Sequence, residues 1–359
     1  MKTPLFKYLA FALVYVALFS CSKEKYIPIE ISPVVFDINE VPYETLSEYV
    51  FFKGPIANQN PSYGVLPFKP ISKLFTDYAQ KKRFVWMPEN TQATYNEDHT
   101  ILDFPEGAVL IKNFYYNNVL PANTTKILET RVLIKKENEW ILANYVWNDA
   151  QTEATLDTGN HSVPIAWNLN GIEMAVNYKI PAAVECLTCH KKNNNAIAIG
   201  VKPQNLNALY TYKDGTKNQL LKWVDMGYLQ EGIPENIQTI VDWSDATQSL
   251  ALRARSYLDS NCAHCHSEGT HCSYRPLRFE FKDTTDPTNT GICVVPDESI
   301  GVSLTYVVAP GRSEKSVMSY RLNSNYEEIR MPLVGRTIVH QEGVELIDDW
   351  INSLTQTCE

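Results

Sequence analysis

The segment KILETRVLIKKENEWILANYVW, residues 126–147, predicts the fold of the N-terminal half more clearly than any other stretch. Two runs rich in β-branched and aromatic residues flank a short polar turn at residues 136–139, a pattern typical of a β-hairpin. Within the first run, the side chains of residues 131–136 alternate between the two sides of the strand. We therefore expect one face of this hairpin to be buried and the other to be wet.

Other segments rich in β-branched and aromatic residues precede this hairpin or form part of it. Turns containing Pro, Gly or Asn, such as those at residues 105–107 and 121–123, separate them from one another. The predicted strands are residues 101–104, 108–116, 126–135 and 140–147. The sequence thus predicts a β-rich, sandwich-like or barrel-like N-terminal domain over residues 41–180.

After Pro181 the sequence pattern changes from one typical of strands to one typical of helices. Apolar residues then recur at helical spacing, and Asp245 is placed to cap one of the helices. The predicted helices are residues 218–229, 245–260 and 342–354. We expect a helical region over residues 181–244 and a further domain over residues 245–359, so the predicted fold class is α+β multidomain.

The N-terminus has the layout of an export signal. Lys2 and Lys7 precede an apolar run at residues 8–19 that is too short to span a bilayer. The residues that follow resemble a bacterial lipobox, in which Cys21 would be lipidated after cleavage; in an ordinary cleaved signal Cys21 would be an incidental thiol. We expect a signal peptide over residues 1–20, a tether over residues 21–40, and a lipid anchor on the periplasmic face or at the cell surface.

Charge and size exclude some classes of protein. The chain has 359 residues and a formal net charge of −9, and 44% of its residues are hydrophobic. This size and composition fit about two or three domains with buried cores. The sequence contains no cluster of Lys and Arg of the kind that binds the phosphates of a nucleic acid. We therefore expect no nucleic-acid partner.

The sequence Cys-x-x-Cys-His occurs twice, at residues 186–190 and 262–266. In this motif two thiols add to the vinyl groups of haem, and the adjacent His binds the iron. Attachment of this kind takes place outside the cytoplasm, which agrees with the export signal. The predicted ligands of two covalent haem c groups are Cys186, Cys189 and His190 at the first site, and Cys262, Cys265 and His266 at the second.

Two other uses of these cysteines remain open. Four thiolates in two pairs could hold a tetrahedral Zn²⁺, although this would leave the His after each pair unexplained. A redox-active disulfide within one pair would need a βαβ context, which the sequence does not predict.

Residues 245–356 resemble a class I cytochrome c over their whole length. The parts that carry the resemblance are a helix leading into Cys262, a Met-Pro pair at Met331-Pro332, and a closing helix. The resemblance implies an all-α domain in which Met331 is the sixth ligand of the second haem, opposite His266. It also suggests that Pro310-Gly311 supplies a carbonyl to the proximal imidazole. Met318 is the other candidate for the sixth ligand of the second haem, but its apolar neighbours favour a place in the hydrophobic core.

The sixth ligand of the first haem stays open. Met226 lies on a predicted amphipathic helix, where core packing is the plainer interpretation. The candidates are Met226, Met87, Met174, His161, or no side chain at all.

The remaining His and Cys residues have simpler interpretations. His264 lies inside the second motif and His271 follows it, and both would face solvent or a haem propionate; His340 would cap the final helix. Cys272 and Cys293 bracket a loop rich in Asp, Thr and Pro, so we predict a disulfide between them, with Cys358 free or intermolecular.

The chain as a whole resembles a family of bacterial di-haem c-type cytochromes with a β-rich N-terminal region. The segments that carry the resemblance are residues 82–86, 104–112, 145–151, 185–190 and 328–336. It implies two haems and electron transfer with redox donor and acceptor proteins, and brings no established substrate. Lys82, Arg83 and Trp86, together with Trp147 and Trp167, could line an interface, or could be paired surface charges and β-core packing.

Three functions remain in competition. Outer-sphere electron transfer needs nothing beyond haem. A di-haem peroxidase or other haem oxidoreductase would need an open iron position at the first site. The third possibility is a binding module in the β-rich region, with the cytochrome as its electron outlet.

Overall fold

The computed structural model describes residues 31–301 and 303–358, and the chain from Ser32 onward forms one compact unit. The predicted signal peptide, Cys21 and the first part of the predicted tether lie outside the described residues. Among the described residues, no helix has both the length and the apolar character that crossing a membrane requires.

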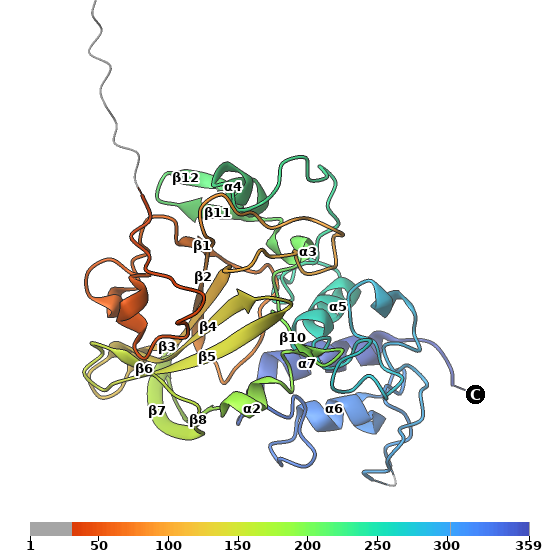
Figure 1. Ribbon diagram of the computed structural model, residues 1–359. Helices are drawn as coiled ribbons and strands as arrows, with labels where there is room; N and C mark the ends of the chain where they lie inside the picture. Colours follow the sequence, from red (N-terminus) through yellow and green to blue (C-terminus); the bar gives the residue numbers. More distant parts are fainter. Residues whose placement is uncertain (1–30, 302, 359) are drawn as a thin grey trace, which may run out of the picture. The chain divides into compact units, whose positions relative to one another are not determined.

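The centre of the molecule is one antiparallel sheet of eight strands (Figure 1). Strands β1 to β6 follow one another in sequence order, and the β7–β8 hairpin joins through a pairing of β7 with the end of β3. The strands are β1 (Leu66–Phe68), β2 (Gln80–Trp86), β3 (Val109–Val119), β4 (Thr124–Lys136), β5 (Glu139–Trp147), β6 (Ala154–Leu156), β7 (His161–Leu169) and β8 (Ile172–Ile180). The β-rich N-terminal region is thus confirmed. The expected sandwich is not found, because these strands form a single sheet.

Three of the four predicted strands correspond to β3, β4 and β5. Residues 101–104 do not form a strand: a single bridge joins Asp103 to Thr94. The predicted hairpin is formed by β4 and β5, with Lys136 paired to Glu139 across its turn.

Both faces of the sheet are covered, so the expected wet face of the hairpin is wrong. Val132 and Ile134 pack in one hydrophobic cluster, and Leu133 between them packs in another on the opposite face. The short helices η1 (Leu46–Tyr49) and η2 (Ile56–Asn58) contribute to the first cluster. Residues from 196 to 237 cover the other face, so the core crosses the predicted domain boundary at residue 180.

The last part of the predicted tether is not a free linker. Val34, Phe36 and Ile38 pack against the cluster that includes η1. In addition, the indole nitrogen of Trp86 donates to the hydroxyl of Ser32 over 3.2 Å. These contacts attach the segment to the sheet from Ser32 onward.

The region predicted as helical between residues 181 and 244 is mixed. It holds α2 (Ala183–Cys186), α3 (Pro203–Leu206) and α4 (Gln219–Asp225), and the hairpins β9–β10 (Lys191–Lys192, Asn195–Ala196) and β11–β12 (Leu209–Tyr212, Gly215–Asn218). Helix α4 begins where predicted, because the Asn218 side chain accepts from the amides of Leu220 and Leu221. It ends early because Gly227 adopts a positive φ, which stops the helix.

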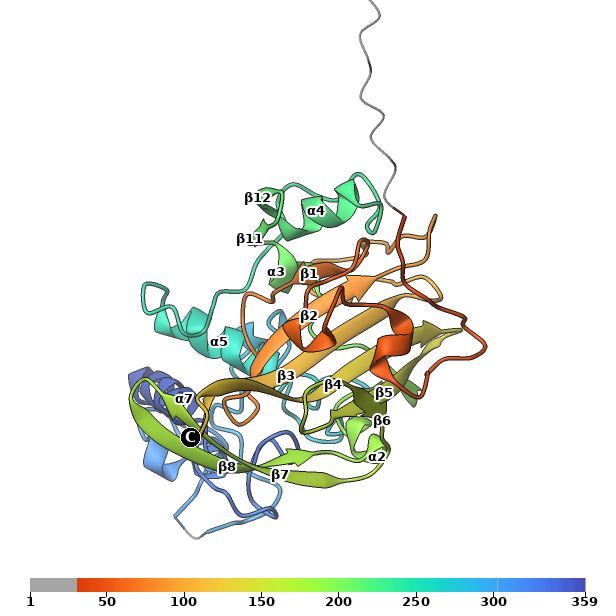
Figure 2. The same cartoon turned by 90° about the vertical axis from the view of Figure 1, so that its left-hand side faces the viewer.

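The C-terminal part has few helices joined by long irregular segments. They are α5 (Leu250–Asn261), η3 (Asp283–Thr285), η4 (Ser313–Lys315), α6 (Val317–Leu322) and α7 (Gln341–Ser353). Ser249, rather than the predicted Asp245, caps α5 by accepting from the Leu252 amide. Leu258 of α5 packs with Ile347 and Ile351 of α7 in one cluster. Figures 1 and 2 show α5, α6 and α7 on one side of the sheet, with α4 and the β11–β12 hairpin at one end.

Candidate functional site

The two Cys-x-x-Cys-His motifs begin at the ends of two helices that are distant in sequence. Cys186 is the last residue of α2, and Cys262 follows directly after α5. In both motifs the His amide donates to the carbonyl of the first Cys, over 2.8 Å from His190 and 3.0 Å from His266. The same helical turn therefore sets the spacing of sulfur and imidazole at both places.

The fold brings the two motifs into contact. The Sγ of Cys265 lies 3.9 Å from the Sγ of Cys189 and 3.4 Å from the carbonyl oxygen of Thr188. The sequence places these cysteines in separate predicted domains and gives no sign of the contact.

A cavity of about 340 Å³ opens beside the first motif, and Cys186, Cys189 and His190 line it. The Nδ1 of His190 lies 2.9 Å from the Ile197 carbonyl, which fixes Nδ1 as the protonated nitrogen. Nε2 is then the nitrogen left to bind a metal. Burial lowers the pKa of His190 to about 4, so the imidazole is neutral, as a metal ligand must be.

A second cavity, of about 390 Å³, is lined by Cys262, Cys265 and His266, and also by Met331 and Met318. The Nδ1 of His266 is buried and has no hydrogen-bond partner among the described residues. Burial lowers the pKa of His266 to about 4.

The expected bond from the Pro310-Gly311 carbonyl to the His266 ring is not formed among the described residues, because Nδ1 of His266 has no partner there. The Gly311 amide donates to the carbonyl of Ile351 in α7 over 2.9 Å.

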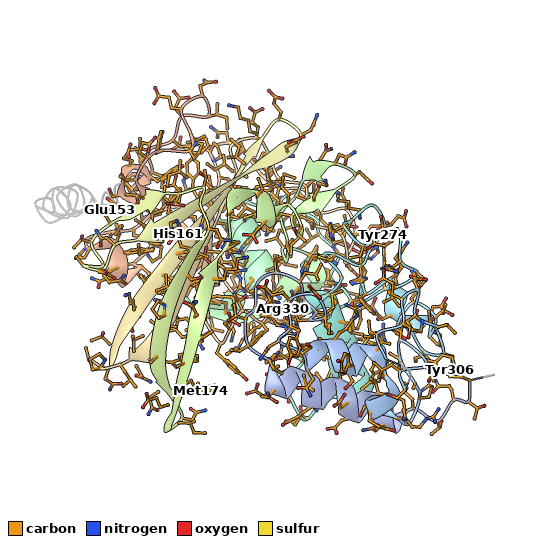
Figure 3. The ribbon with its side chains drawn as sticks, turned by 90° about the horizontal axis from the view of Figure 1, so that it is seen from below. Glu153, His161, Met174, Tyr274, Tyr306 and Arg330 are labelled. Atoms are coloured by element: carbon orange, nitrogen blue, oxygen red, sulfur yellow. A yellow bond between two sulfur atoms is a disulfide. The ribbon has the colours of Figure 1, made fainter. Side chains whose placement is uncertain are left out.

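Arg336 holds the loop that carries Met331. Its guanidinium is buried and donates to the Met331 carbonyl over 3.0 Å, and to several further carbonyls along residues 321–338. Asp77 ties the same loop to the chain just before β2, because its carboxylate accepts from the amides of Thr337 and Ile338 over 2.7 and 3.1 Å. Figure 3 shows Arg330, the neighbour of Met331, between the sheet and the C-terminal helices.

None of the side chains predicted as sixth ligand of the first haem lines the first cavity. Met226 and Met87 pack in the cluster around Trp223. Figure 3 shows Met174 near the far tip of the β7–β8 hairpin, and His161 pairs with Asp157 at the surface over 2.8 Å. The histidines that line this cavity are His99, His190 and His264.

The three histidines with simpler predicted roles differ in outcome. His264 is half-buried: its Nδ1 is buried and has no hydrogen-bond partner in the part of the chain that the structure describes, and the residue lines both cavities. His271 is exposed, as predicted. His340 stands at the N-cap of α7, but its side chain bonds to the Tyr257 hydroxyl over 3.0 Å and makes no cap bond.

The predicted disulfide is wrong. Cys293 is bonded to Cys358, and Cys272 is a buried free thiol. The chain after α7 returns to the irregular segment that follows η3, which sequence spacing alone could not indicate.

Cys189, His264 and Cys265 place one ligand atom each within 4.8 Å of one another, so a metal ion is the other group that this arrangement could hold. A hydrogen bond from Cys265 lowers the pKa of Cys189, which favours a thiolate there. Cys186 and Cys262 are outside the cluster, so the four-cysteine Zn²⁺ site, which was the open alternative to haem, is not assembled. Zn²⁺ here would also leave both cavities and His190 unexplained.

Several residues at the first cavity were missed from the sequence. Arg83, Lys112 and Arg131 lie on β2, β3 and β4 and line the cavity beside His190. The tryptophans considered with Arg83 are core residues, since Trp86, Trp147 and Trp167 are all buried.

Comparisons of this chain with protein-family models, with curated proteins and with solved structures found no match.

Proposed function

We propose that this chain is a lipid-anchored di-haem c-type cytochrome that transfers electrons in the periplasm or at the cell surface. The observation that carries the proposal is that each Cys-x-x-Cys-His motif lines a cavity of its own. Cys189 and His264 belong to the walls of both cavities, so the two sites adjoin. Haem, when bound, supplies reversible one-electron chemistry.

The residues present fit two haems. At the first site the cysteines would carry the thioether bonds, and the bond from His190 to Ile197 turns the ring nitrogen Nε2 toward a metal. At the second site His266 and Met331 line the same cavity, which supports a His/Met pair. A neutral thioether ligand favours Fe(II) and would give the second site the higher potential.

The finer assignment of residues 245–356 to a class I cytochrome c domain is part of this proposal. It is supported by the packing of α5 against α7 and by the position of Met331 on the wall of the cavity that holds Cys262 and His266. Arg336, through its bonds to the carbonyls of the Met331 loop, would hold the thioether in place.

The contact between the motifs favours rapid electron exchange within the chain. Because Cys189 and Cys265 are 3.9 Å apart at sulfur, porphyrins bonded to them would have adjacent edges. Two one-electron groups held next to each other by these residues would allow the chain to take an electron from a donor protein and pass one to an acceptor protein. Export and lipidation of Cys21 are proposed from the sequence pattern at residues 1–21.

A di-haem oxidoreductase is the second candidate. The described residues that line the first cavity include no Met, and His99 and Lys112 are among them. An open iron position at this site would allow a small substrate such as peroxide to bind. Visible and EPR spectra of the oxidised protein with and without peroxide separate the two: a carrier gives unchanged spectra, and a peroxidase gives an oxidised intermediate.

The proposal is tested by maturing the full-length protein in cells that assemble c-type cytochromes. We expect a red protein whose haemochrome spectrum gives two haems per chain. Replacing both cysteines of either motif, in C186A/C189A or C262A/C265A, should remove one haem and leave the other. A colourless protein containing stoichiometric zinc would instead support the metal cluster at Cys189, His264 and Cys265.

A further inference from the structure

A row of three cations crosses the sheet at the first cavity. Arg83 on β2 pairs in register with Lys112 on β3, and Lys112 pairs with Arg131 on β4. Residues directly opposite on antiparallel strands project from the same face of the sheet. All three side chains line the cavity that holds Cys186 and His190.

The row is not balanced by carboxylates. Arg131 has a bidentate partner, because its Nη2 and Nε donate hydrogen bonds to the carboxylate of the buried Glu129 over 2.6 and 2.9 Å. The Lys112 ammonium lies 4.8 Å from the centroid of the Phe114 ring. Among the described residues, neither Lys112 nor Arg83 bonds to a carboxylate.

The surroundings make these two charges costly. Like charges directly opposite one another on paired strands destabilise a sheet. Burial lowers the pKa of Arg83 to about 10. Burial, and then the neighbouring Arg83, lower the pKa of Lys112 well below its ordinary value. A bound anion would relieve both effects.

The rest of the cavity wall does not supply that anion. Six cations line it and only three carboxylates, and these carboxylates already have cationic partners. Lys179 holds Glu185 over 2.7 Å, and Lys202 holds Asp259 and Glu280 over 3.2 and 3.3 Å. The cationic lining residues are Arg83, Lys112, Arg131, Lys192, Lys202 and Lys282, and the acidic ones are Glu185, Asp259 and Glu280.

We propose that Arg83 and Lys112 bind the propionate carboxylates of the first haem, an inference that rests on the proposed function. A c-type haem brings two carboxylates, and carboxylates withdrawn from water need charged hydrogen-bond partners. A guanidinium suits a carboxylate because its planar fork can donate two parallel bonds. Of the three cations in the row, Arg131 is already engaged by Glu129, which leaves Arg83 and Lys112 to face the cavity without a carboxylate partner.

The test compares the mature two-haem protein with Arg83→Gln and Lys112→Gln variants by redox titration. Loss of a cation beside the propionates stabilises the oxidised haem. The potential of the first haem should therefore fall, and its pH dependence, which reports propionate protonation, should move to higher pH. The second haem serves as an internal reference, and the exposed Lys82→Gln on the opposite side of β2 serves as the matched control.

Each outcome distinguishes the inference from the proposed function. Two attached haems with unchanged potentials in both variants would overturn the inference and leave the proposed function standing, whereas a wild-type chain without haem would remove both. If Arg83→Gln fails to fold, Lys112→Gln still gives the comparison, and Arg83→Lys, which keeps the charge but not the planar fork, should lower the potential less than Lys112→Gln does. The last experiment repeats the redox titration with added inorganic phosphate or acetate. If either shifts the potential in wild type but not in Arg83→Gln, the row binds a free anion and the propionate assignment fails.

Discussion

The sulfur of Cys265 lies 3.9 Å from the sulfur of Cys189, although 76 residues separate them in the chain. The two motifs start from different helices, α2 and α5, and meet where the two cavities adjoin. Whatever group each motif holds therefore lies next to the other group.

Magnetic coupling between the two haems is the first expected consequence. Because the thioether sulfurs would be in contact, the EPR spectrum of the fully oxidised protein should show interaction between the two Fe(III) centres. The matched controls are C186A/C189A and C262A/C265A, each of which keeps one haem. If the spectrum of the intact protein equals the sum of the two single-haem spectra, the haems are not adjacent.

Met331 is expected to set the potential of the second haem. Met331→His replaces a thioether by an imidazole, which should lower that potential by roughly 0.1–0.3 V, within the ~0.8 V span that axial ligands cover. The absorption band that marks Met ligation of Fe(III) should disappear. Met318→Leu is the control, because Met318 lines the same cavity. If Met318→Leu removes the band and Met331→His does not, the ligand is Met318.

The disulfide between Cys293 and Cys358 should stabilise the C-terminal part. It closes a loop with a sequence separation of 65. On the chain-entropy account, its loss from Cys293→Ser/Cys358→Ser should reduce the free energy of unfolding by about 2–4 kcal/mol. A peptide map without reductant should show these two cysteines linked and Cys272 reactive toward alkylation once the protein is unfolded. A Cys272–Cys293 peptide would contradict the pairing.

His340 should make stability depend on pH. Its ring stacks on Phe75 with centroids 4.0 Å apart, and burial lowers its pKa from 6.5 to about 4. Between those values the unfolded chain binds the proton and the folded chain does not, so this contribution is complete above pH 6.5 and is lost as the pH falls toward 4. The loss amounts to at most about 3 kcal/mol at 1.36 kcal/mol per pKa unit.

Denaturant unfolding of His340→Gln between pH 4 and 7 checks this linkage. The variant should be less stable at pH 7, because the stacking is lost, but its free energy of unfolding should fall less steeply on acidification. If the free energy of unfolding of His340→Gln falls as steeply on acidification as that of wild type, His340 does not titrate as expected.

The strands could be predicted from the sequence because their signals are local. Residues 126–147 contain both strands and the turn of the β4–β5 hairpin. The covering of both sheet faces could not be predicted, because it depends on η1 and on residues after 196 that pack from far along the chain. For the same reason, the sequence does not show that Val34, within the predicted tether, packs against the sheet.

At the candidate site, too, features formed by neighbouring residues could be predicted, whereas contacts between distant residues could not. Each Cys-x-x-Cys-His motif is five consecutive residues, so the motif can be recognised from the sequence alone, and its use for haem stays a prediction. The row formed by Arg83, Lys112 and Arg131 depends on strand register, and the Cys293–Cys358 bond depends on how the chain returns after α7. Neither relation leaves a pattern in the sequence around the residues concerned.

The intact mass of the mature protein, measured together with its haemochrome spectrum, tests the central claim most directly. The account predicts a mass increased by two covalently bound haems, together with the spectrum of thioether-linked haem. An unmodified polypeptide mass and a colourless protein, produced in cells that mature other c-type cytochromes, would contradict it.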